Sequence, residues 1–92
     1  MRKDGYYCLV VKHSGKCLQV AHSKHEDQAR VIEYTLNGTD AQKWRLRDAG
    51  DGYFYIIAKH SDKALHCAEN GDGIYQFTFN FSDNQKWKFE PV

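Results

Sequence analysis

Short runs of strand-forming residues alternate with polar turns along the whole chain. Six runs rich in apolar, β-branched or aromatic residues occur, at 6–11, 18–20, 31–36, 53–58, 65–67 and 74–79. None shows a 3.6-residue period over three turns, which argues against helices. Gly, Asn, Asp and Ser separate the runs, as they do at turns between strands. A further strand in each half carries Trp44 or Trp87, so we predict an all-β chain with about four strands per half.

The two halves of the chain are copies of one another. Residues 5–14 align with 52–61 at an offset of 47, and a four-residue contraction then changes the offset to 43. The second offset pairs Gln-Lys-Trp at 42–44 with Gln-Lys-Trp at 85–87, and fourteen positions are identical in all. Internal repeats of this kind indicate one structural unit used twice. We therefore divide a single domain, 1–92, into repeat one (5–47) and repeat two (52–90).

Composition excludes several classes of protein. Ninety-two residues are enough for one small domain, and 41% hydrophobic residues are typical of a globular one. A net charge of +1 gives no electrostatic footprint for nucleic acid. No apolar run approaches the roughly 18 residues of a spanning helix, so we expect no membrane partner.

The three cysteines are Cys8, Cys17 and Cys67. An odd number, with no apolar N-terminal stretch of signal-peptide length, favours reduced thiols and a cytoplasmic location. A Cys8–Cys17 bridge is sterically possible. A tight turn at 14–15 would, however, place Lys12 opposite Cys17, and we expect free thiols.

Two motifs carry a family resemblance. Ser-Gly-Lys-Cys-Leu at 14–18 precedes Asn-Gly-x-Asp-x-Gln-x-Trp at 37–44, and repeat two has the same order at 61–65 and 80–87. The chain resembles ricin-type lectin repeats, with their Gln-x-Trp signature, from about Gly5 to Phe89. The resemblance implies a β-trefoil, in which three repeats build a six-stranded barrel and a hairpin cap. It also implies carbohydrate binding, as a lectin or as a module attached to a glycoside hydrolase.

Two repeats of a trefoil leave the barrel incomplete. Four barrel strands cannot close, and open sheet edges recruit other chains. Repeat two also carries aromatic residues of one parity, which would line one face of a strand: Tyr75, Phe77, Phe79 and Phe81. The halves 1–47 and 48–92 carry net charges of +4 and −3. Together these features predict a homo-oligomer, with a dimer favoured, and the alternative is that the chain is part of a longer trefoil. The aromatic strip itself has two interpretations, a subunit interface or a platform for sugar.

Sugar recognition needs an aromatic platform and short polar side chains that bind hydroxyl groups. The resemblance implies an Asp on the second strand, an aromatic residue on the third, and an Asn before the Gln of Gln-x-Trp. Repeat two has His66, Phe77 and Asn84 at these positions, with Gln76 as a secondary contact. We predict the better site there.

Repeat one departs further from the family pattern. It has Gln19, Tyr34 and Ala41 at the three positions, so the resemblance implies at most a weak site built by Gln19 and Tyr34. The motif residues themselves are expected to fix loops and fill the core, and they are Gln42, Trp44, Gln85 and Trp87.

No pattern of a catalytic site is apparent. Ser14 and Ser61 lie in the turns that both repeats share, without a readable base, so we expect a binding module and no enzyme. A polar loop contains His22, His25 and neighbouring acidic residues, but it lacks fixed metal-ligand spacing, and we expect no metal or cofactor. The competing hypothesis is a trefoil-like interaction or structural module whose sugar sites have decayed.

Overall fold

The computed structural model describes residues 5–71 and 73–91. Its strands are β1 (Cys17–Val20), β2 (Val31–Tyr34), β3 (Trp44–Gly50), β4 (Tyr53–Ala58), β5 (Ala64–Cys67), β6 (Ile74–Phe77) and β7 (Trp87–Lys88). Three single turns of 3₁₀ helix complete the regular structure of the described residues, which contain no α-helix. The chain is therefore all-β. No helical turn in the described ranges is long and apolar enough to cross a membrane.

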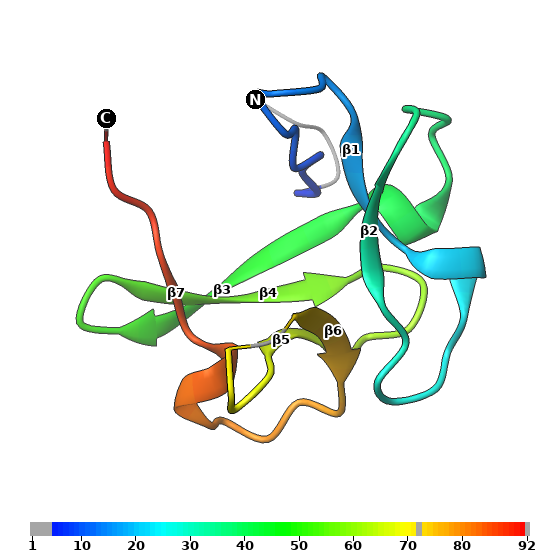
Figure 1. The fold of residues 1–92 in the computed structure, drawn as a ribbon. Helices are drawn as coiled ribbons and strands as arrows, with labels where there is room; N and C mark the ends of the chain where they lie inside the picture. Colours follow the sequence, from blue (N-terminus) through cyan, green and yellow to red (C-terminus); the bar gives the residue numbers. More distant parts are fainter. Residues whose placement is uncertain (1–4, 72, 92) are drawn as a thin grey trace.

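A long β-ribbon joins the two repeats. Figure 1 shows β3 and β4 crossing the middle of the molecule, with the β1–β2 hairpin at one end, the β5–β6 hairpin below, and β7 crossing β4 near the other end. The register runs from Trp44 opposite Ala58 to Gly50 opposite Tyr53. Asp51 and Gly52 close the ribbon with φ values of 55° and 83°, a conformation that suits glycine.

The hydrophobic core lies where the two hairpins meet the ribbon. Val20 of β1, Trp44 of β3 and Ala58 of β4 have no exposed surface, and Ile56 and Leu65 pack with them. Burial of large apolar side chains of this kind contributes roughly 1.5–3 kcal/mol each. The core therefore holds both repeats in one unit.

The segment 6–11 does not form the continuous strand that its apolar pattern predicts. It makes two isolated antiparallel bridges, Tyr7 with Trp44 and Val10 with Cys17. The segment changes partner along its length, from the ribbon to the β1–β2 hairpin, so no single ladder extends over it.

The third strand of each repeat ends two residues earlier than predicted, at Tyr34 and Phe77. The reason is the same in both repeats. The carbonyl groups of Thr35 and Thr78 accept hydrogen bonds from side-chain amides, at 2.8 and 2.9 Å, and so are directed away from a strand partner.

The first hairpin turn is longer than the predicted two-residue turn at 14–15. Val11 donates to the carbonyl of Lys16 at 2.8 Å, and Gly15 donates back to Val11 at 2.7 Å. Val10, and not Lys12, therefore lies opposite Cys17.

Candidate functional site

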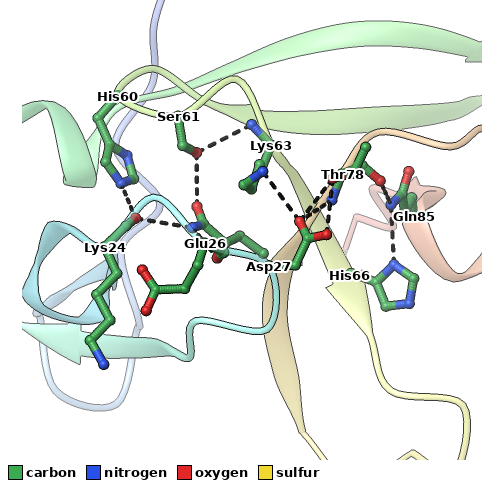
Figure 2. Close-up of polar contacts among 10 residues, drawn as sticks. Lys24, Glu26, Asp27, His60, Ser61, Lys63, His66, Thr78 and Gln85 are labelled. Carbon is green, nitrogen blue, oxygen red and sulfur yellow. Dashed lines mark hydrogen bonds and ion pairs between the residues drawn. The ribbon is translucent and has the colours of Figure 1, made fainter.

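A buried glutamine organises the loop of repeat two. Gln85 has no exposed surface; its Oε1 accepts from the backbone N–H of Asn80 at 3.0 Å, and its Nε2 donates to the carbonyl of Thr78 at 2.9 Å. The same Nε2 lies 3.1 Å from Nδ1 of His66, as Figure 2 shows. Because an amide NH₂ group only donates, Nδ1 accepts and the ring carries its proton on Nε2.

Repeat one contains the same network with a different acceptor. Gln42 accepts from Asn37 at 2.9 Å and donates to the carbonyl of Thr35 at 2.8 Å. Its second amide proton goes to Oε1 of Gln19 at 2.9 Å. Gln19 therefore takes the place that His66 has in repeat two.

The two tryptophans of the Gln-x-Trp motifs also make equivalent contacts. Nε1 of Trp44 donates to the carbonyl of Leu18 at 3.1 Å, and Nε1 of Trp87 donates to Leu65 at 3.0 Å. Trp44 is fully buried, whereas Trp87 is half-buried on β7, which pairs only with β4 within the described chain. These contacts are structural, and they tie each fourth strand to the second strand of its own repeat.

β5 and β6 bring His66 and Phe77 together, with ring centroids 5.1 Å apart. Tyr75 stacks on His66 at 5.2 Å with an interplanar angle of 15°, because the register places the two residues opposite each other. Tyr75 was not assigned to the sugar site itself, but it belongs to the aromatic strip for which a sugar platform is one of the two interpretations. The sequence feature that points to Tyr75 is strand alternation, which places this residue on the same face as Phe77.

Asn84 is hydrogen-bonded to the end of β5 and opens onto a separate cleft. Its Nδ2 donates to the carbonyl of Cys67 at 2.8 Å, which leaves Oδ1 able to accept a hydrogen bond. A cleft of about 370 Å³ runs past Asn84, and Glu69 also lines it. Neither His66 nor Phe77 borders the cleft, so the predicted site residues form two adjoining groups.

Charged side chains border that cleft, and sequence reasoning did not single them out. Lys86 lies 3.2 Å from Asp83, whose hydrogen bond and charge raise the pKa of the lysine. Both residues also border a second cleft of about 380 Å³, together with Asp51 and Tyr53. Asp83 and Lys86 belong to the motif Asp-x-Gln-Lys-Trp, which occurs in both repeats. The motif alone does not tell whether such an ion pair contacts a ligand or only lies on the surface.

Gln76 has a structural position, in contrast to the secondary sugar contact predicted for it. It has no exposed surface, and its Oε1 accepts from the hydroxyl of Ser61 at 2.8 Å. Its Nε2 donates to the carbonyls of Lys24 and Glu26, at 3.0 and 2.8 Å. Every polar atom of the amide is thus used to hold the loop of repeat one against repeat two, and none is left for a ligand.

Asp27 adds an electrostatic contact at the same junction between repeats. Figure 2 shows its carboxylate between Thr78 and Lys63; it accepts from the backbone N–H of Thr78 at 2.8 Å and pairs with Lys63 at 3.2 Å. Burial alone would raise the pKa of Asp27, but the hydrogen bonds from Thr78 and the contact with Lys63 outweigh it and lower the pKa.

The corresponding positions in repeat one offer less to a ligand. Tyr34 is half-exposed on β2, and Gln19, engaged by Gln42, is 8% exposed, much as His66 is 7% exposed in repeat two. Ala41 is buried where repeat two has Asn84. The geometry leaves Tyr34 as the accessible member of this group.

The predicted aromatic strip separates into two groups. β6 ends at Phe77, so strand alternation stops there. Phe79 and Phe81 pack instead around Tyr55, with centroids at 4.6 and 6.0 Å, and the guanidinium of Arg47 lies 5.0 Å from the Phe79 ring. Phe81 remains 60% exposed.

The described part of the chain contains no group of three or more His, Cys, Asp or Glu placed to hold a metal ion. In the polar loop considered above, the ring of His25 packs against His60 at 4.8 Å, and Asp27 faces Lys63. These residues bind other parts of the protein.

The Gln-x-Trp geometry of repeat one agrees with a comparison against known families. Residues 1–77 match the ricin-type β-trefoil lectin domain-like family. The chain belongs to this family. No curated protein matches it.

Solved structures share the fold. A designed three-fold symmetric protein, ThreeFoil, is 42% identical with a TM-score of 0.92, and the match covers 100% of this chain and 69% of that one. The exo-β-1,3-galactanase 1,3Gal43A from Clostridium thermocellum is 35% identical with a TM-score of 0.86, covering 91% of this chain and 19% of the enzyme. A Polyporus squamosus lectin, 21% identical, gives a TM-score of 0.77 over 92% of this chain and 30% of the lectin.

Proposed function

We propose that this domain binds carbohydrate without catalysing a reaction, and that repeat two holds the better site. Phe77 supplies the apolar platform and His66 a ring N–H donor, and Asn84 supplies an amide oxygen acceptor from the adjoining cleft. The Gln85–His66 hydrogen bond carries the proposal, because it fixes the imidazole with Nε2–H as the remaining donor. Figure 2 shows that nitrogen on the side of the ring away from Gln85, and a hydroxyl group that reaches it would accept the hydrogen bond.

Galactose-containing glycans are the first ligands to test. The Clostridium thermocellum relative is an exo-β-1,3-galactanase, and the Polyporus squamosus lectin was solved with Neu5Acα2-6Galβ1-4GlcNAc. Both contain a domain with this fold, although this chain spans only 19% and 30% of their lengths. Family membership and these two neighbours support sugar binding by the present chain.

The test is a glycan array followed by calorimetric titration of the best galactosyl ligand. Phe77→Ala should weaken binding at least about tenfold, since loss of an aromatic contact removes an apolar platform. Tyr34→Ala is the matched control at the equivalent position of repeat one, and it should leave the affinity of the stronger site unchanged. Absence of binding up to millimolar ligand, with no effect of either variant, would favour the interaction-module hypothesis.

We also propose that the chain associates with a second copy, as a homodimer, through the edges that two repeats leave open. Residues 6–11 form only isolated bridges and β7 pairs with β4 alone in the described chain. Val10 and Phe89 lie at these edges and are 61% and 54% exposed. Apolar side chains beside unpaired strand groups are typical of surfaces that another chain covers.

A further inference from the structure

We propose that Cys8 and Cys17 form a thiol pair that closes to an intramolecular disulfide when a mild thiol oxidant, such as glutathione disulfide, is present. Their Sγ atoms are 3.4 Å apart. Cys8 is exposed and so accessible to the oxidant, whereas Cys17 is 1% exposed. The third cysteine, Cys67, belongs to β5 of the other repeat and serves as an internal reference.

The backbone already holds the two sulfur atoms near bonding geometry. Val10 bridges Cys17, and Leu18 donates to the carbonyl of Leu9 at 2.9 Å, so Cys8 lies diagonally across the strand pair from Cys17. A disulfide has an S–S distance of about 2.05 Å. The sulfur atoms must therefore approach by little more than 1 Å, which rotation of the exposed Cys8 side chain can supply.

The order of steps follows from the surroundings of the two thiols. Burial, together with the contact with Cys8, raises the pKa of Cys17. The exposed Cys8 thiolate therefore attacks glutathione disulfide first, forming a mixed disulfide and releasing one glutathione thiolate. Cys17, deprotonated, then attacks Sγ of Cys8 and releases the second glutathione. Two thiols are oxidised and one glutathione disulfide is reduced to two glutathione molecules.

The bond would add a covalent link to a segment that has no continuous strand ladder. Residues 6–11 make only two isolated bridges, and Cys8 Sγ lies 3.9 Å from the carbonyl of Gln42 in the Gln-x-Trp motif of repeat one. Cross-linking residues nine apart removes loop entropy from the unfolded chain and should raise the folding equilibrium constant by up to about a hundredfold.

The experiment is oxidation of the folded, reduced protein with excess glutathione disulfide, followed by thiol counting in denaturant and mass spectrometry. One free thiol per chain, Cys67, and a mass loss of about 2 Da for the two hydrogen atoms are expected. Trypsin cleaves after Lys12 and Lys16, so the bridge should link the separate peptides 4–12 and 17–24.

Matched variants make the result specific. Oxidised Cys67→Ser should retain no free thiol, whereas Cys8→Ser should retain two and form no intramolecular bridge. Oxidation in guanidinium chloride should be slower and leave more mixed disulfide, because the fold creates the contact between the two sulfur atoms. Three persistent thiols, a stable mixed disulfide at Cys8, or a bridge that involves Cys67 would overturn the proposal.

Discussion

Nε2 of Gln85 donates a hydrogen bond to Nδ1 of His66 over 3.1 Å, in the place where Gln42 donates to Gln19 in repeat one. The ricin-type pattern implies an Asp at this position. Asp, Gln and neutral His can all accept from the glutamine amide, so each preserves the loop. They differ in the group that remains for a ligand: a carboxylate leaves an acceptor, whereas His66 leaves an N–H donor.

The first prediction concerns replacement of His66. His66→Leu leaves one amide proton of the buried Gln85 without an acceptor and should lower the free energy of unfolding by about 1–3 kcal/mol. His66→Gln supplies the acceptor that Gln19 provides in repeat one, so it should lower the free energy of unfolding by less than about 1 kcal/mol. Urea denaturation measures both. Equal losses in the two variants would mean that packing against Tyr75, and not the hydrogen bond, sets the stability.

The second prediction concerns the acid sensitivity of the junction between repeats. Asp27→Asn keeps an acceptor for Thr78 but removes the charge that faces Lys63, at a partly exposed site, so the cost at pH 7 should be about 0.5–1 kcal/mol. The pKa of Asp27 is lowered from its ordinary 3.8. The wild-type advantage is therefore complete above that value and disappears as the pH falls through the lowered pKa.

The control for this prediction is Glu69→Gln, which removes an exposed carboxylate that makes no ion pair within the described residues. Its unfolding free energy should follow that of the wild-type protein across the whole range. A difference between wild type and Asp27→Asn that persists unchanged at pH 2 would show that charge on Asp27 is not responsible.

The all-β fold and the equivalence of the Gln-x-Trp loops could be predicted because they depend on local pattern. Apolar runs, turn residues and a repeated motif can be recognised in the amino-acid sequence alone. Strand ends were less predictable, since the carbonyl groups of Thr35 and Thr78 accept from side-chain amides of glutamines seven residues further along the chain. Apolar alternation does not reveal this competition between a side chain and a strand partner.

The site was only partly predictable because some of its residues are engaged by residues far away in the sequence. His66 and Phe77 do lie together, as the family pattern implies. The commitment of Gln76 to the carbonyls of Lys24 and Glu26 depends on residues about fifty positions away, which no alternation or motif reveals. The contact between Cys8 and Cys17 was likewise hidden by the assumed turn, because a change in hairpin register moves every partner along the strand.

The third prediction concerns Gln76, whose buried side-chain amide is replaced by an exposed carboxylate at the equivalent position of repeat one. Glu33 of repeat one is equivalent to Gln76, accepts from Ser14 as Gln76 does from Ser61, and is exposed. Gln76→Glu would set a buried carboxylate against two carbonyl oxygens and should lower stability by about 3 kcal/mol or more at pH 7. The reciprocal Glu33→Gln should change it by less than about 0.5 kcal/mol.

Acid provides a second measurement on the same variant. Burial raises the pKa of the introduced carboxyl, and the protonated form can donate to one carbonyl. Gln76→Glu should therefore regain part of its stability relative to wild type as the pH is lowered toward 4. A variant that is equally unstable at every pH would contradict an electrostatic cause.

The fourth prediction concerns association of the chain. Sedimentation equilibrium at tens of micromolar should give about twice the 10.7 kDa of the single chain. Val10→Asp and Phe89→Asp place charges at the open edges and should shift the species toward monomer, by about tenfold or more in dissociation constant, because a buried unpaired charge is costly. Phe81→Asp tests the aromatic group around Tyr55, where Phe81 is 60% exposed. If only Phe81→Asp disrupts the dimer, the aromatic group is the interface and the edges are not. A folded species of single-chain mass at these concentrations would refute association through either surface.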